Sequence, residues 1–381
     1  MGNIRKILNQ IISPKVNYRP LIEVRIFKDA LHHNLNIYQK LYPKLQFAPV
    51  IKSNAYGHGM VEVAKILDHE PKAFFMVDSF YEALVLRRAG IKSKILVLGY
   101  CRQEQLLNAK LKDVSFGIID LQILKNLSAG LKKLLNIHLK IDTGMHRQGI
   151  LLSEISEAIA TVKLNPNIIL EGICTHFADA DGNDSAFMQS QIQAWNKIVK
   201  IFQAAFPKIK YWHASATAGA RYADQIDANV SRLGIGLYGI NPSPFEKMDL
   251  HPALEMVSLI SSIKNIPAGE KVGYGITFES KQPMTIATVP VGYNEGVDRR
   301  LSNKGFYKID GKSCPIIGRV SMNISSIDVS AVKDVHLEQE AVVISANPAD
   351  QNSVENIAKL CGCISYEILV HIPQHLRRVV V

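Results

Sequence analysis

Polar side chains stand where several short apolar runs of this chain end, and they are of types that bind anions and form covalent bonds. These residues are Lys52, Lys140, Asp142, Arg147, Thr175, His176, His213, Thr217 and Arg232. If the runs are parallel strands of one barrel, their C-terminal ends meet at one face, where the active sites of that fold lie. The chain therefore predicts one site assembled from residues that are far apart in sequence.

Lys52 is the residue of this set with the most specific chemistry. It follows the apolar run 47–51 and precedes the stretch Ser53-Asn-Ala-Tyr-Gly-His-Gly59. A lysine at the end of a buried strand is partly desolvated, which favours the neutral amine that forms a Schiff base with a carbonyl. The glycines let the backbone approach a bound group closely. Taken alone, Lys52 could instead extend from its strand into solvent.

The elements that must position these residues form a repeating pattern. Short apolar runs occupy residues 47–51, 73–77, 94–98, 115–119, 137–141, 168–175, 209–212 and 233–238. Amphipathic helices are expected at 60–69, 79–89, 121–135, 153–163 and 186–205. Parallel strands need crossovers of helix length, so the pattern favours a parallel (β/α)₈ barrel of the TIM type. A doubly wound open sheet is the alternative that the pattern alone allows, and the count of strands favours the barrel.

The pattern changes after the proline-rich break Asn241-Pro-Ser-Pro244. Alternating β-branched runs follow at 256–263, 285–291, 315–320, 324–329 and 341–344, then a short helix near 354–360 and a strand ending at Val381. These runs predict a mainly β C-terminal domain. We expect an N-terminal extension at 1–16, a barrel domain at 17–245 and a β domain at 246–381. A first strand at about 17–26 is expected to pair with the β domain.

Composition and charge exclude several classes of function. The charged fraction of 20% is ordinary for a globular protein, and no apolar run approaches the roughly 20 residues that span a bilayer. The net charge of +10 comes from scattered residues, which indicates a surface that favours anionic ligands rather than nucleic acid or a membrane. An odd number of cysteines and no secretory signal predict a cytoplasmic protein. Cys361-Gly-Cys363 lacks the spacing of a zinc pair, so no metal site is expected.

An ordered set of motifs continues through both predicted domains. In the barrel they are Val50-Ile-Lys-Ser-Asn-Ala-Tyr-Gly-His-Gly59, Lys140-Ile-Asp-Thr-Gly-Met-His-Arg147, Thr175-His-Phe-Ala-Asp-Ala-Asp181 and Ser231-Arg-Leu-Gly-Ile-Gly-Leu-Tyr-Gly239. In the β domain they are Val272-Gly-Tyr-Gly275, Pro290-Val-Gly-Tyr293, Gly318-Arg-Val-Ser-Met322 and Ser365-Tyr-Glu367. From about Asn17 to the C-terminus the chain resembles the alanine racemases, which use pyridoxal 5'-phosphate (PLP). The lysine motif alone also occurs in other PLP barrels, whereas the ordered set is specific.

The resemblance implies a racemase that interconverts L-alanine and D-alanine and supplies D-alanine for peptidoglycan. Lys52 would carry PLP as an imine, Leu98 would line the cofactor pocket, and the phosphate would be held by Tyr56, Thr217, Gly234, Ile235 and Tyr366. Arg232 would donate to the pyridine nitrogen, and His176 would connect Arg232 to the catalytic tyrosine. Because arginine stays protonated, it would keep the pyridine ring neutral and so limit transamination.

Racemisation needs a base on each face of the reacting carbon. The resemblance implies that Lys52 serves one face and Tyr274 the other, with cationic neighbours assisting the loss of the tyrosine proton. Tyr274 lies in the β domain, which in this family covers the barrel of a second subunit, so a homodimer is expected. Arg147 would hold Tyr274 or the substrate carboxylate. Met322 would supply a backbone donor near that carboxylate, and Tyr293 would narrow the entrance.

Lys140 has two interpretations. It lies seven residues before Arg147, as in family members whose lysine carries a carbamate that positions the arginine. The alternative is a buried ion pair with Asp142. The sequence alone leaves both open.

Three positions depart from the family pattern: Ala216 replaces an asparagine beside the phosphate loop, and Asn323 and Glu295 replace aspartates near the substrate entrance. These changes put the selectivity of the entrance in doubt. A racemase for serine or lysine on the same scaffold is therefore the alternative enzyme. A decarboxylase is disfavoured because its site would place an acid, not Arg232, at the pyridine nitrogen. A non-enzymatic PLP-carrier barrel would lack the domain that supplies Tyr274.

Overall fold

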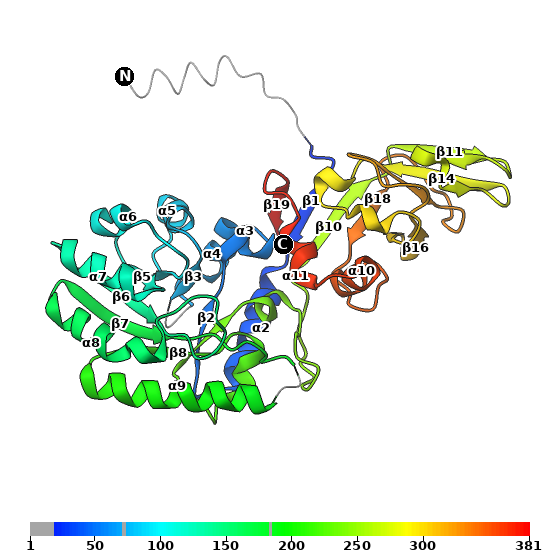
Figure 1. Ribbon diagram of the computed structural model, residues 1–381. Coiled ribbons are helices and arrows are strands. Elements are labelled where there is room, and N and C mark those ends of the chain that lie inside the picture. Colours follow the sequence, from blue (N-terminus) through cyan, green and yellow to red (C-terminus); the bar gives the residue numbers. More distant parts are fainter. Residues whose placement is uncertain (1–18, 71–73, 183–184) are drawn as a thin grey trace, which may run out of the picture.

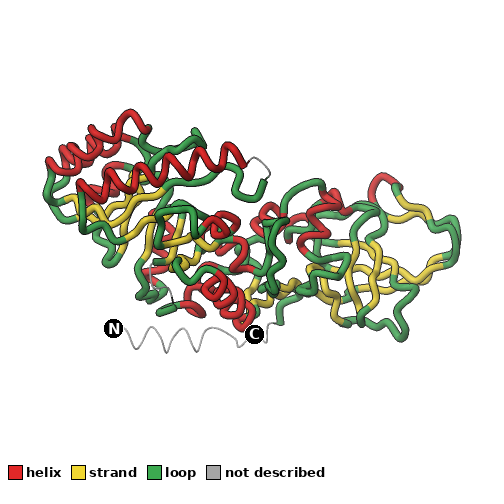
Figure 2. The backbone as a smooth tube through the Cα atoms, turned by 90° about the horizontal axis from the view of Figure 1, so that it is seen from below, coloured by secondary structure: helices red, strands yellow, loops and turns green. Residues whose placement is uncertain are grey.

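The computed structural model describes residues 19–70, 74–182 and 185–381. The expected extension at 1–16, and the first residue of the predicted strand 73–77, lie outside the described residues. The described chain forms two lobes, a helix-covered barrel and a mainly β lobe beside it (Figures 1 and 2).

Within the described residues, eight parallel strands form a closed barrel. They are β2 Gln46–Pro49, β3 Phe75–Val77, β4 Ile95–Val97, β5 Val114–Ile118, β6 Leu135–Lys140, β7 Ile168–Cys174, β8 Tyr211–His213 and β9 Val230–Leu233. Strands β3 to β8 form one sheet in chain order, and β2 pairs with β9. Bridges from Val50 to Met76 and from Ala216 to Arg232 join these two sheets at both edges. The predicted (β/α)₈ barrel is confirmed.

Helices cover the outside of the barrel (Figure 1). They are α2 Lys28–Leu41, α4 Met60–Leu67, α5 Phe80–Arg88, α6 Gln103–Asn108, α7 Leu121–Gly130, α8 Ile155–Leu164 and α9 Ser185–Ala205. Local capping sets where several of them begin: Ser79 and Glu82 form a capping box at α5, and the Asp120 carboxylate accepts two backbone N–H groups at α7. Helix α7 is shorter than the predicted 121–135 because Leu131 is already extended.

The eighth strand lies earlier than predicted. Residues 233–238 were expected to form it, but β9 covers Val230–Leu233 and a buried 3₁₀ helix, η3 Ile235–Tyr238, follows. The prediction was wrong because a short buried 3₁₀ turn is as apolar as a buried strand. Gly236 faces the Tyr38 hydroxyl so closely that a Cβ would lie 2.5 Å from it. Because η3 and α2 are far apart in the sequence, the pattern of residues 233–238 could not show this close packing.

The second lobe is built mainly of antiparallel strands. They are β10 Leu254–Leu259, β11 Ser262–Ile266, β12 Lys271–Val272, β13 Phe278–Glu279, β14 Met284–Val289, β15 Phe306–Ile309, β16 Lys312–Pro315, β17 Ser325–Asp328, β18 Glu340–Ile344 and β19 Arg377–Val380. The expected mainly β domain is confirmed. The predicted strand at 315–320 is wrong, because β16 ends at Pro315 and Gly318 has a φ of +72°.

The beginning of the described chain belongs to the sheet of the second lobe. Strand β1 Glu23–Ile26 lies between β10 and β19 in a sheet of order β16-β15-β18-β10-β1-β19. It pairs antiparallel with β10 and parallel with β19. From β1 in this sheet the described chain continues into the barrel and then returns to the second lobe, which ties the two lobes together (Figure 1).

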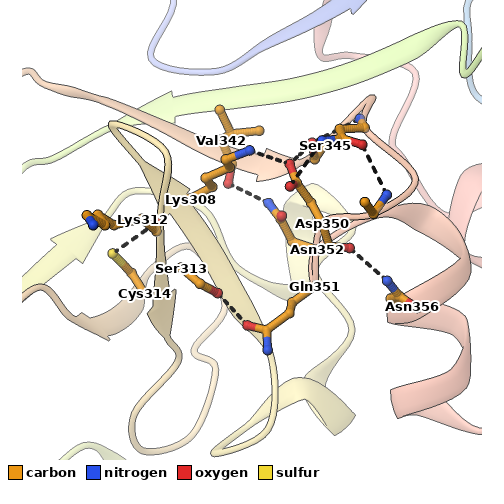
Figure 3. A network of polar contacts seen from close by, with 12 residues as sticks. Lys308, Lys312, Ser313, Cys314, Val342, Ser345, Asp350, Gln351, Asn352 and Asn356 are labelled. Atoms are coloured by element: carbon orange, nitrogen blue, oxygen red, sulfur yellow. Dashed lines mark hydrogen bonds and ion pairs between the residues drawn. The ribbon is translucent and has the colours of Figure 1, made fainter. Parts of the chain in front are cut away.

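Polar contacts fasten the loop after β18 to the β15–β16 hairpin (Figure 3). The Asp350 carboxylate accepts from Lys308 Nζ at 2.7 Å and from Ser345 Oγ at 2.6 Å. Asn352 donates to the Val342 carbonyl at 2.9 Å, and Asn356 donates to the Asp350 carbonyl at 2.8 Å. The loop thus holds the start of α10 Val354–Cys361 against the sheet.

Two C-terminal elements close over the barrel mouth. Helix α11 Ser365–Val370 packs on the turn after β2, where a Cβ on Gly57 would lie 2.1 Å from the Leu369 carbonyl oxygen. Arg378, from β19, donates to the Gly57 carbonyl at 2.8 Å. Among the described helices, none is long and apolar enough to cross a lipid bilayer.

Candidate active site

A cavity of about 810 Å³ opens at the C-terminal ends of the barrel strands. Its lining includes Lys52, Tyr56, Leu98, Lys140, Arg147, Thr175, His176, Thr217, Arg232, Gly234, Ile235 and Tyr366. The structure thus brings together the predicted residues of the barrel, with Tyr366 contributed by α11. His213 and Asp142 are not among the lining residues. Four cationic side chains in one cavity suit an anionic ligand.

Lys52 begins an unusual turn of backbone. The four residues after it, Ser53 to Tyr56, all have φ between 52° and 55°. A left-handed conformation costs about 1–2 kcal/mol for each residue with a Cβ, so surrounding contacts must hold this turn. The Lys52 ammonium lies 3.4 Å from the Asp78 carboxylate. The turn places Lys52 in the lining of the cavity, where its side chain is 37% exposed.

Arg232 is fixed by more partners than any other cavity cation. It is 2% exposed, and its guanidinium donates to the carbonyls of His213, Thr175 and Ala214 at 2.5, 2.8 and 3.0 Å. It also donates to His176 Nδ1 at 2.9 Å. A guanidinium only donates, so His176 must accept at Nδ1 and carry its proton on Nε2. Arg232 therefore sets the tautomer of His176.

Arg232 also sets the tautomers along a chain of buried histidines. Arg232 Nη1 lies 3.2 Å from His213 Nδ1, and His213 Nε2 lies 2.8 Å from His138 Nδ1. His213 must accept from Arg232, so it donates to His138. Burial, assisted by nearby cations, lowers the pKa of both His138 and His176 to about 3. The cavity floor is thus a neutral histidine network around one buried cation.

One end of the cavity is a cradle of hydroxyl and backbone N–H groups. Thr217 Oγ1 accepts from the backbone N–H groups of Gly234 and Gly236 at 3.1 and 3.4 Å. A Cβ at Gly234 would lie 2.9 Å from the Tyr56 hydroxyl oxygen, so only glycine leaves this space open. The Tyr56 and Tyr366 rings lie 5.8 Å apart. Such a group of donors fits a phosphate.

Lys140 is buried. Among its contacts in the described part of the chain there is no ion pair with Asp142. Its Nζ donates to Gln148 Oε1 at 3.3 Å, whereas the Asp142 carboxylate accepts from the backbone N–H groups of Gly144 and His146. Burial, together with the Arg147 and Arg232 cations, lowers the pKa of Lys140. This environment shifts the Lys140 amine toward its neutral form.

Comparison with known proteins identifies the family. The alanine racemase N-terminal domain model matches residues 26–242, and the alanine racemase C-terminal domain model matches residues 253–380. The chain belongs to the alanine racemase family. It is 37% identical to the alanine racemase of Carboxydothermus hydrogenoformans over 93% of this chain and 97% of that protein. It is 36% identical to the alanine racemase of Lactobacillus gasseri over 95% of this chain and 98% of that protein.

Solved structures give the same result. Alanine racemase from Clostridium difficile 630 has a TM-score of 0.88 at 30% identity, covering 96% of this chain and 97% of that chain. The Bacillus anthracis enzyme, solved with bound L-Ala-P, has a TM-score of 0.87 at 29% identity, covering 97% of this chain and 96% of that chain. The predicted family, fold class and alanine racemase activity, an isomerase reaction, are therefore confirmed.

Three expected residues of this alanine racemase lie away from its own cavity. Tyr274, Met322 and Tyr293 are in the β lobe, are not among the lining residues and are 72, 56 and 44% exposed. Ile276 and Ile324 beside them are 62 and 48% exposed. A single chain therefore offers Lys52 in a cavity and Tyr274 on an open, partly apolar surface.

The structure accounts for two of the departures from the family pattern together. Asn323 donates to the buried Glu295 carboxylate at 2.6 Å, so the two replacements form one hydrogen-bonded pair. The backbone around them is also linked, since Tyr293 N–H donates to the Ser321 carbonyl and Asn294 N–H to the Met322 carbonyl. These bonds tie the backbone at Tyr293 to the backbone at Met322. Ala216, the third departure, forms an isolated parallel β-bridge with Arg232 and lines the cavity.

Sequence reasoning missed several residues around the cavity. Asp78 follows β3 just as Lys52 follows β2, so the rule of strand ends could have found it. The capping pair Ser79-x-x-Glu82 was also visible. His138 lies within β6 and had no signal beyond its place in an apolar run. Away from the cavity, His33, Asp249 and His251 lie close together, but the two rings are stacked with an angle of 4°, so their lone pairs do not converge on one ion.

Proposed function

We propose that this alanine racemase uses PLP, held at the cavity by the residues that the resemblance implied. When bound, PLP supplies an aldehyde that joins the Lys52 amine and a ring that withdraws electrons from the α-carbon of alanine. The cradle at Tyr56, Thr217, Gly234, Ile235 and Tyr366 would bind the phosphate, and Leu98 would contact the ring. The hydroxyls and the open space at Gly234 fit such an anion, and the N–H groups of Gly234 and Gly236 hold Thr217 Oγ1 in place.

Arg232 would face the pyridine nitrogen. Its guanidinium is held by three carbonyls and by His176, so it cannot turn away. Because arginine is already protonated, it cannot take a proton from the ring. His176 keeps its Nε2–H available as a donor toward the tyrosine that approaches the cavity. These contacts support a neutral ring, which favours return of the α-proton over transamination.

Lys52 and Tyr274 would act as the two bases of the reaction. Lys52 lies in the cavity and takes or returns a proton on one face of the α-carbon. Tyr274 is exposed on the β lobe, so it reaches a cavity only if a second subunit brings it there. The exposed residues Tyr274, Ile276, Met322 and Ile324 support a homodimer that buries this surface. Arg147 and Met322 would then hold the substrate carboxylate, and Tyr293 would narrow the entrance.

Lys140 would carry a carbamate. Burial lowers the pKa of Lys140 and so raises the share of neutral amine that can attack carbon dioxide. The nitrogen loses a proton to solvent as the N–C bond forms, and the carbamate anion would lie among the Arg147 and Arg232 cations. The bond from Lys140 to Gln148, rather than to Asp142, supports this role. A mass increase of one carbon dioxide on the peptide that contains Lys140 would test it.

We further propose a cytoplasmic enzyme that supplies D-alanine for peptidoglycan, with domains at 17–245 and 246–381. The family matches, which end at 242 and resume at 253, support this division. All five cysteines are free, which suits a reducing compartment.

The observation that carries the proposal is the convergence of Lys52, Arg232 and the phosphate cradle on one cavity. Borohydride reduction of PLP-loaded protein followed by peptide mapping should label Lys52. Lys52→Ala should lose both the visible absorbance of the cofactor and L-alanine racemisation. A label on another lysine would contradict the proposal.

A further inference from the structure

One carboxylate fastens the ends of two barrel strands to each other. Glu82, in the first turn of α5, accepts from the Ser53 backbone N–H at 2.7 Å with Oε1. Its Oε2 accepts from the backbone N–H groups of Asp78 and Ser79 at 2.7 and 3.1 Å. Ser53 belongs to the turn after β2, whereas Asp78 and Ser79 follow β3. The Glu82 side chain therefore spans the exits of two neighbouring strands.

The turn that Glu82 holds is the left-handed turn after Lys52. Because residues 53–56 carry side chains, their backbone conformation is unfavourable without support. Ser53 is the first residue of this turn, and its N–H is in the peptide bond to Lys52. A bond to that N–H fixes the direction in which the Lys52 side chain leaves the backbone.

A second carboxylate contacts the Lys52 amine itself. The Val50–Met76 bridge and the bond from Ile51 N–H to the Met76 carbonyl set the two strand ends level. This register places the Asp78 carboxylate 3.4 Å from Lys52 Nζ. Gly99 allows a close approach of the chain to Asp78, since a Cβ there would lie 2.2 Å from the Asp78 carbonyl oxygen and 3.1 Å from its Cγ.

We propose that Glu82 and Asp78 are positioning residues for Lys52, with Glu82 fixing the backbone turn and Asp78 pairing with the side-chain ammonium. This inference rests on the proposed function, in which Lys52 is the cofactor lysine. Glu82 holds the backbone from which the Lys52 side chain leaves, and Asp78 holds the ammonium group of that side chain by an ion pair. The two roles predict different experimental signatures.

Glu82→Gln tests the backbone role with little change in shape. An amide keeps one acceptor oxygen and replaces the other with a donor, so it cannot accept from both strand ends. Capture of PLP by cofactor-free protein, followed by absorbance, should slow by about tenfold, and kcat should fall by about 10–100-fold, because small misplacements of a reacting group are costly. The visible circular dichroism of the bound cofactor should weaken. Glu82→Asp, which keeps the charge but shortens the reach, should show the same defects.

Glu154→Gln is the matched control. The Glu154 carboxylate also accepts a backbone N–H at a helix start, that of Leu151 at 2.8 Å. Leu151 does not line the cavity, whereas the three residues that Glu82 holds, Ser53, Asp78 and Ser79, do. Glu154→Gln should leave the rate of capture and the circular dichroism at wild-type values. If Glu82→Gln and Glu82→Asp both match this control, Glu82 has only a capping role and the proposal fails for it.

Asp78→Asn tests the ion pair. Without the carboxylate the cofactor does not have to displace an ion pair at Lys52 Nζ, so capture at low salt should be about threefold faster, the size expected of a partly exposed pair. The difference should shrink in 1 M sodium chloride, because salt screens the pair. A capture rate equal to that of the wild type at low salt would refute the role of Asp78. Borohydride mapping of every variant separates the two proposals: a label away from Lys52 refutes the proposed function, whereas a Lys52 label with wild-type capture refutes only the positioning roles.

Discussion

At the scale of single residues, the buried His58 makes the folding stability of this protein depend on pH. His58 is 1% exposed, and its Nδ1 donates to the carbonyls of Ala55 and Tyr56. Its Nε2 has no partner among the described residues. Burial lowers the pKa of His58 from 6.5 to about 4. The His58 imidazole therefore stays neutral in the folded protein at pH values where the same imidazole is already protonated in the unfolded chain.

This difference predicts a loss of stability in mild acid. Because the folded-state pKa is the lower one, the unfolded state binds the proton first as the pH falls, and stability is lost from about pH 6.5 down to about pH 4. Between pH 7 and pH 5 the contribution of His58 should be about 2 kcal/mol. Urea unfolding at pH 7 and at pH 5 should show that His58→Gln loses about 2 kcal/mol less folding stability between these pH values than the wild type does. His33→Gln, at a partly exposed histidine, should keep the wild-type loss, and an equal loss in both variants would contradict the assignment.

At the scale of elements, the loop between β18 and α10 depends on one carboxylate (Figure 3). Burial opposes the charge of Asp350, but the bonds from Lys308 and Ser345 outweigh it and lower the pKa of Asp350. Asp350→Asn should reduce the free energy of unfolding at pH 7 by about 2 kcal/mol, the usual size for hydrogen bonds to a charged group. Since its folded pKa is the lower one, this contribution is present above the unfolded pKa and disappears as the pH falls through the folded pKa.

Thermal and urea unfolding would measure the Asp350 effect. Asp334→Asn is the control, because Asp334 is exposed in the same lobe and asparagine tolerates its φ of +51°. The two variants should differ clearly at pH 7 and converge in acid. A destabilisation of Asp350→Asn that does not change with pH would point to shape rather than charge.

At the scale of the whole molecule, the separation of Lys52 and Tyr274 underlies our proposal that activity needs a pair of chains. If Tyr274 serves the partner's cavity, Lys52→Ala and Tyr274→Phe should each be inactive and should complement each other after subunit exchange. A mixed dimer holds one site with both defects and one with neither. Random mixing of equal amounts makes half the dimers mixed, so about a quarter of wild-type activity should return.

Activity of the mixture, with subunit exchange verified by mass-tagged chains, measures this outcome. Mixing two preparations of Lys52→Ala is the control and should restore nothing. Verified exchange without recovery would mean that Tyr274 acts within its own chain or is not a base.

Much of this protein could be predicted from the order of its residues. The spacing of apolar runs predicted the barrel because each parallel strand needs a crossover, and β-branched alternation predicted the second domain. Residues at strand ends, such as Lys52 and Arg232, were found because parallel strands share one active face. The family motifs then suggested roles for them. These signals are local in sequence, so they can be recognised without a structure.

Other features depend on contacts between distant segments. Residues 23–26 join the β lobe because β1 pairs with β10 and β19, and the 3₁₀ helix at 235–238 packs closely on Tyr38 through Gly236. The left-handed turn after Lys52 was equally hidden. The capping pair Ser79-x-x-Glu82 was visible, but the bond from Ser53 N–H to Glu82 was not. Hydrogen-bond partners and close packing are set by where backbones meet in space. Sequence spacing determines which elements form, but only the folded chain decides which donor meets which acceptor.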